Sequence, residues 1–195
     1  MGDFSASLAA FLPRTLWPLL EGREEELRLE GSILFADLAG FTSLTENLAR
    51  IGHEGAEELT RICNAFFERM IAVSHEEGGD VLRFGGDAMT LFFPSGTAAA
   101  LRAALRMQEE SLAFQSLETR GGVFGLSMKV GLSRGPVLVG LVGDGSLGFD
   151  YFAAGQALDR AADAEHHASR GQVVLCPLCG EQAREMGVAT EPLAD

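Results

Sequence analysis

The chain has 195 residues, a length that fits one domain better than two. Hydrophobic residues make up 47% of it and charged residues 22%, which is the composition of a globular domain with a core. The net charge of -13 argues against a nucleic-acid-binding protein, because such a protein presents a basic face to the phosphate backbone.

Residues 1–20 are apolar at irregular helical spacing, and Pro13 and Pro18 interrupt any long helix there. We expect a short helix that packs on the domain or on a partner. Membrane attachment is less favoured, because Arg14 is the only basic residue of the segment. We expect no signal peptide, no membrane span and no disulfide framework from the three cysteines, and therefore a cytoplasmic protein.

Residues 21–30 are a charged run that leads into the fold. Residues 32–37 are apolar and stop at an acidic residue, which predicts a buried strand. Gly40 then marks a tight turn, and Thr42 or Ser43 is expected to cap the next helical stretch.

Apolar side chains recur at helical spacing over residues 54–77, and a glycine pair ends that predicted helix. Residues 80–93 predict two strands joined at Gly85-Gly86, which places Asp87 beside the turn. The remaining predicted elements are a helix at 97–114, a strand, Gly-Pro turn and strand at 128–143, a strand at 150–154, a helix at 156–169, a strand at 172–176 and a helix at 177–186.

This order predicts an α+β fold with one mixed sheet and the helices on one face. We divide the chain into a helical and charged lead-in, residues 1–30, and a single domain, residues 31–195.

Two acidic residues carry the chemistry of the predicted domain. Asp37 ends a buried strand and precedes a Gly-Phe-Thr turn, and Asp87 lies at the Gly-Gly hairpin. The helix between them returns the chain, so that the strands can lie side by side. Two carboxylates at neighbouring strand ends suit Mg²⁺ or Mn²⁺, and the backbone N–H groups of residues 39–42 can bind phosphate oxygens.

These motifs resemble those of class III nucleotide cyclases. FADLAGFTSLTE at 35–46 is similar to the first metal motif of that family, and LRFGGDAMTLFF at 82–93 is similar to its second. The glycines of VGLSRGPVLVGLVG, residues 130–143, match the segment that follows. The resemblance implies a ferredoxin-like βαββαβ core with extra strands, and a head-to-tail dimer with active sites between two domains.

The resemblance also implies roles for individual residues. Asp37 and Asp87 would bind two Mg²⁺ or Mn²⁺ ions per active site, with the backbone carbonyl of Leu38. Ala39, Gly40, Phe41 and Thr42 would contact the phosphates of ATP or GTP.

Four positions depart from the family pattern. Arg83 stands where the family commonly has a base-reading lysine, and Gln156 where it has Asp or Thr. Asp159 replaces an asparagine, and Asp163 replaces the arginine that stabilises the charge on the reacting phosphorus. The chain therefore resembles the first, metal-bearing domain of soluble adenylyl cyclases, which needs a second cyclase domain, in the same parent chain or another.

Alternatives remain open at this point. Asp37 could cap a helix or accept a phosphoryl group, and Asp159 and Asp163 could be plain solvated residues. The chain could be a catalytically degenerate domain that binds nucleotide or a partner, or a dimerisation domain alone. Cys176-Pro-Leu-Cys179 lacks a second ligand pair, so core packing explains Cys176 better than zinc.

Overall fold

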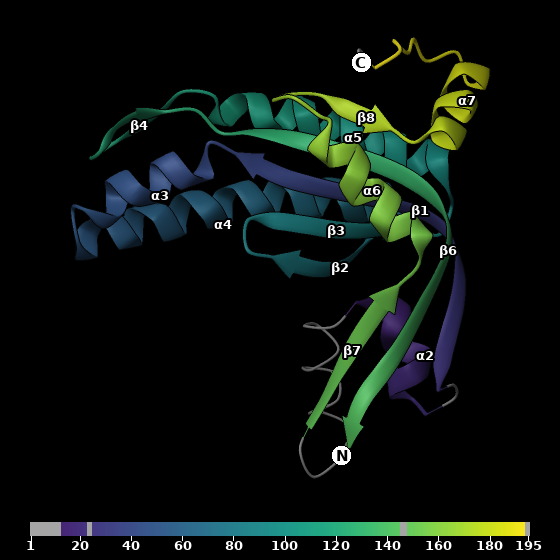
Figure 1. Ribbon diagram of the computed structural model, residues 1–195. Helices are drawn as coiled ribbons and strands as arrows, with labels where there is room; N and C mark the ends of the chain where they lie inside the picture. The colour runs from purple at the N-terminus through teal and green to yellow at the C-terminus, as the bar shows by residue number, and fades with distance from the viewer. Residues whose placement is uncertain (1–12, 23–24, 145–147, 194–195) are drawn as a thin grey trace.

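A computed structural model describes residues 13–22, 25–144 and 148–193. Figure 1 shows a curled sheet with helices packed against it. The elements in chain order are η1 (Arg14–Leu16), α2 (Trp17–Leu20), β1 (Glu26–Ala39), α3 (Phe41–Ala49), α4 (His53–Glu76), β2 (Asp80–Gly85), β3 (Ala88–Phe93), α5 (Thr97–Ser111), η2 (Leu112–Phe114), β4 (Leu117–Thr119), β5 (Gly122–Phe124), β6 (Ser127–Asp144), β7 (Gly148–Ala154), α6 (Gln156–His166), β8 (Val173–Leu175) and α7 (Pro177–Glu185).

The main sheet has the strand order β2-β3-β1-β6-β7, with β8 paired to β6. The pairs along this path are antiparallel, whereas β8 runs parallel to β6. Strands β2, β3, β1 and β6 and the helices that join them form the ferredoxin-like βαββαβ arrangement, and β7 and β8 extend the sheet. The predicted α+β fold class is therefore confirmed.

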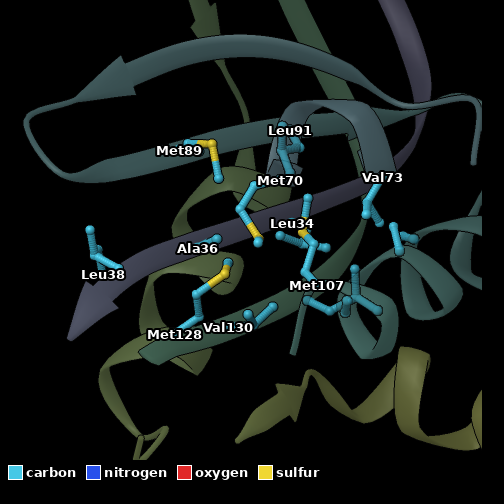
Figure 2. Packing of buried hydrophobic residues seen from close by; sticks show 14 of the residues in the cluster. Leu34, Ala36, Leu38, Met70, Val73, Met89, Leu91, Met107, Met128 and Val130 are labelled. Carbon is cyan, nitrogen blue, oxygen red and sulfur yellow. The ribbon is translucent and has the colours of Figure 1, made fainter. Parts of the chain in front are cut away.

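Strand β1 directs alternate side chains to opposite faces of the sheet. Leu34, Ala36 and Leu38 point into the larger hydrophobic cluster with side chains of α3, α4, α5 and α7. Figure 2 shows Met70 of α4 and Met107 of α5 packing in this cluster. The larger cluster therefore packs α3, α4, α5 and α7 against one face of the sheet.

The opposite face of the sheet carries a second, smaller cluster. Ile33 of β1 packs there with Ala157 and Ala161 of α6, and with Leu16 and Leu19 from the N-terminal segment. The expectation that the helices share one face was therefore wrong. A buried apolar stripe on each face of β1 needs a cover on each side, and α6 with α2 covers the second.

Residues 13–22, the described part of the N-terminal segment, pack on the domain, which was one of the two predicted possibilities. Leu16 is 0% exposed, and the backbone N–H and hydroxyl of Thr15 donate to Asp80 Oδ2 at 2.8 and 2.7 Å. The expectations for residues 1–12 lie outside the described part of the chain. The division at residue 30 stays a prediction, although β1 starts four residues earlier, at Glu26.

Two strands are longer than the sequence predicts. β1 runs from Glu26 rather than from residue 32, and β6 continues through Gly135-Pro136 without a turn. The reason is mutual pairing, since Glu26 to Glu30 of β1 pair with Gly140 to Pro136 of β6. The small β4–β5 hairpin was not predicted.

Within the described ranges, no helix has both the length and the hydropathy for a membrane crossing.

Candidate active site

The first predicted carboxylate, Asp37, lies near the end of the central strand β1. It is the cross-strand neighbour of Ala88 in β3 and of Lys129 in β6. Because Ala36 and Leu38 point into the larger cluster, Asp37 points to the other face, where α6 packs. Its side chain is 28% exposed, so the carboxylate can meet a ligand from solvent.

Lys129 links this carboxylate to α6. Its ammonium nitrogen lies 3.4 Å from Asp37 Oδ2 and 2.5 Å from Glu165 Oε1, and the Glu165 side chain is only 4% exposed. The hydrogen bond to Glu165 is the main reason that the pKa of Lys129 is raised, and the charge of Asp37 adds to it. The ammonium is therefore held charged between the two carboxylates.

Neither Lys129 nor Glu165 was predicted from the sequence as part of the site. A signal was available: Lys129 is the only lysine of the chain and stands between Met128 and Val130, which are apolar. In a strand, that alternation places the lysine on the face opposite the larger cluster, which is the face of Asp37.

The second carboxylate, Asp87, lies in the turn between β2 and β3, rather than at the first residue of a strand. Ala88, which follows it, is the cross-strand partner of Asp37. Asp87 also lies near Cys63 of α4: burial raises the pKa of the Cys63 thiol, and the charge of Asp87 raises it further. The fold thus brings both carboxylates to the same end of the β1–β3 pair.

Beside this end, β1 turns sharply into α3 at Gly40. Gly40 has a left-handed backbone with φ 96°, and a β-carbon there would collide with the carbonyl oxygen of Gly125. Glycine is thus required for both reasons. Gly40 is the N-cap residue of α3, not Thr42 or Ser43, and no side chain forms a cap hydrogen bond at this end of the helix. The N–H groups at the start of α3 are therefore without the side-chain partner that caps most helices.

The predicted phosphate-contacting residues surround this turn. Ala39 ends β1 and is partly buried, and Thr42 is exposed. Phe41 packs its ring against the larger cluster, so that only its backbone is available to a ligand at this turn. The structure brings Ala39, Gly40, Phe41 and Thr42 together with Asp37.

The four departing positions lie on β2 and α6. Arg83 is exposed on β2, and its charge acts on Tyr151 of β7, whose pKa is raised mainly by burial. Gln156 is the first residue of α6 and accepts a hydrogen bond from Arg160 at 2.9 Å. Asp159 and Asp163 are exposed on the same helix.

The donor set fits a hard divalent cation. Within the described part of the chain, no cluster of three or more His, Cys, Asp or Glu side chains forms. The pairing of Asp37 and Asp87 as metal-binding carboxylates therefore stays a prediction. Mg²⁺ is commonly held in this way, by one or two carboxylates together with substrate phosphates and water.

Comparison with known proteins gives consistent matches over most of the chain. A family model for the adenylate and guanylate cyclase catalytic domain matches residues 26–191. Adenylate cyclase type 10 of Rattus norvegicus is 26% identical over 172 residues, which cover 85% of this chain and 11% of the relative. Photoactivated adenylate cyclase subunit beta of Euglena longa is 30% identical over 204 residues, covering 97% of this chain and 21% of the relative.

A solved structure shares the fold. The adenylyl cyclase CyaB from P. aeruginosa superimposes with a TM-score of 0.70 at 23% identity, covering 83% of this chain and 84% of that chain. This chain spans only a minor part of the two curated relatives.

Proposed function

Because the chain belongs to the adenylate and guanylate cyclase catalytic domain family, we propose that it forms the metal-binding half of a composite active site that converts ATP to cyclic AMP and pyrophosphate. The observation that carries this proposal is the convergence of Asp37 and Asp87 at one end of the β1–β3 pair, beside the start of α3, which has no side-chain cap. ATP is favoured over GTP by the relatives named adenylate cyclase, while Arg83 and Gln156 leave the base open.

In this proposal Asp37 and Asp87 would hold two Mg²⁺ or Mn²⁺ ions, and the backbone carbonyl of Leu38 would be a further ligand of one of them. When bound, such ions lower the pKa of the ribose 3′-hydroxyl and neutralise the charge of the leaving pyrophosphate. The backbone N–H groups of Ala39 to Thr42 take up phosphate oxygens and orient the triphosphate. In a chain of net charge -13, binding a triphosphate requires added positive charge of this kind.

The other half of the site would come from a second cyclase domain. Asp159 and Asp163 occupy the positions of the family's asparagine and arginine, and a carboxylate at the latter repels the developing charge on the phosphorus. A partner domain that carries lysine, asparagine and arginine supplies what these positions lack. Such a partner lies in the same parent chain or in another protein.

The test combines the purified chain with a partner cyclase domain that carries the lysine, asparagine and arginine, together with Mn²⁺ and either ATP or GTP. We expect cyclic nucleotide from the mixture, and none when Asp37→Asn or Asp87→Asn replaces the wild type. The matched control is Glu181→Gln, which removes one exposed carboxylate on α7. Absence of product with both nucleotides and a competent partner refutes the catalytic proposal.

The second candidate is a degenerate cyclase domain that binds nucleotide and regulates a partner. Asp163 favours it, since its carboxylate opposes catalysis in a homodimer of this chain. In that case calorimetry detects metal-dependent ATP binding that Asp37→Asn abolishes, yet no partner domain restores turnover. If calorimetry detects no metal-dependent ATP binding in either the wild type or Asp37→Asn, dimerisation alone is the favoured function.

A further inference from the structure

A pair of cysteines lies at the junction between β8 and α7, far along the chain from the predicted metal site. β8 ends at Leu175, Cys176 is the N-cap residue of α7, and Pro177 is its first helical residue. Cys179 follows in the first turn of the helix. A Cys-x-x-Cys sequence that starts at a helix N-terminus places the first sulfur in the positive field of the helix dipole.

The two thiols affect each other's pKa. The Cys179 thiol donates a hydrogen bond to the Cys176 sulfur, and this bond is the largest reason that the pKa of Cys176 is lowered to about 5. Backbone N–H groups of Cys179, Arg134 and Leu178 add to this stabilisation, although none forms a regular helix-cap hydrogen bond. The pKa of Cys179 is correspondingly raised, and that of Cys63, the third cysteine, is raised by burial.

The two thiols differ in access. Cys176 is 7% exposed, whereas Cys179 is 0% exposed and contacts the Thr97 hydroxyl oxygen at 3.6 Å from its sulfur. Both residues are buried, and Cys176 is the more exposed of the two. No third metal ligand joins the pair among the residues that the structure describes, so the arrangement does not favour a zinc site.

We propose that Cys176 and Cys179 form a redox-active dithiol, which hydrogen peroxide converts reversibly into an intramolecular disulfide. The Cys176 thiolate attacks one peroxide oxygen, the O–O bond breaks, and sulfenic acid and hydroxide form. The Cys179 thiol then loses its proton and its sulfur attacks Cys176, so that the S–S bond forms and water leaves. Two thiols are oxidised by two electrons in total, and one peroxide is reduced to two waters.

The test uses the wild-type chain, folded and fully reduced, titrated with hydrogen peroxide near pH 7. After alkylation and tryptic digestion, Cys176 and Cys179 share the peptide of residues 171–184, and Cys63 lies in a different peptide. We expect the 171–184 peptide to lose two hydrogen atoms and its reactivity to the alkylating agent before Cys63 reacts. Dithiothreitol is expected to restore both.

Three variants separate the two roles. Cys179→Ser should accumulate the sulfenic acid at Cys176, which dimedone traps, and Cys176→Ser should protect Cys179 from dilute peroxide. Cys63→Ser is the matched control and should leave the oxidation of the pair unchanged. The proposal is overturned if wild-type Cys176 and Cys179 both remain alkylatable while Cys63 oxidises, or if the 171–184 peptide gains oxygen atoms without losing the two hydrogens.

Discussion

The contact among Lys129, Asp37 and Glu165 allows a quantitative test of how α6 is fixed to the sheet. Replacing Lys129 by methionine keeps the length of the side chain and removes its charge. The Glu165 carboxylate, only 4% exposed and 2.5 Å from the ammonium in the wild type, then loses this cation. Asp37 loses the same cation but is more exposed, so the larger cost falls on Glu165.

Removing one partner of a buried ion pair costs about 3–5 kcal/mol. The Lys129 side chain is 26% exposed, so the lower end of that range applies, about 3 kcal/mol. For a domain of this size, that loss lowers the melting temperature by roughly 6–12 °C. An exposed pair serves as the control: Arg28→Met removes a guanidinium 3.0 Å from Glu26, the two side chains are 81% and 51% exposed, and the change is expected to cost at most about 1 kcal/mol.

The assay is urea unfolding of the wild type, Lys129→Met, Glu165→Met and the double variant. Glu165→Met alone should lower the free energy of unfolding less than Lys129→Met does, because Lys129 keeps its ion pair with Asp37 and is more exposed than Glu165. The double variant should recover most of the stability lost in Lys129→Met, since two apolar side chains replace the buried pair. If the double variant is no more stable than Lys129→Met, the unpaired Glu165 carboxylate is not the cause of the lost stability, and the reasoning is refuted.

The same contact has a predictable pH dependence. The folded-state pKa of Lys129 is raised above its unfolded value of about 10.4. The stability contributed by its charge is therefore complete below about pH 10.4 and is lost as the pH rises through the folded-state pKa. The stability difference between the wild type and Lys129→Met should shrink over that alkaline window, and a constant difference contradicts the assignment.

Three further predictions concern packing and catalysis. Gly131→Ala puts a β-carbon into the backbone of α6 and should cost about 1–3 kcal/mol, whereas Gly180→Ala, in α7 with open space around it, should be neutral or stabilising in thermal melts. Leu16→Ala should cost about 2–5 kcal/mol in urea unfolding if the N-terminal segment is part of the fold, against a small effect for the half-exposed Trp17→Ala. Asp163→Arg should raise the cyclase activity of the chain without a partner about 10²-fold or more over wild type, and an unchanged rate contradicts the proposed role of that position.

The sequence by itself determined the elements that follow from local pattern. The Gly85-Gly86 pair identified the β2–β3 hairpin, and helical spacing over 54–77 identified α4, observed at His53–Glu76. The motifs around Asp37 and Asp87 predicted the cyclase family before any fold was visible. The glycine pair and the helical spacing are local signals, because turn chemistry and side-chain periodicity depend on residues that are neighbours in the chain.

Only the tertiary structure decided which distant residues meet. Periodicity assigns each strand residue to one of two faces, but it does not say which helix covers that face, so α6 was misplaced. The pairing of β1 with β6 lengthened both strands and set Lys129 opposite Asp37, a contact created by register between segments far apart in sequence. The role of Asp37 and Asp87 as metal ligands thus stays a prediction of the motifs, while the cation beside Asp37 depends on how the strands pair.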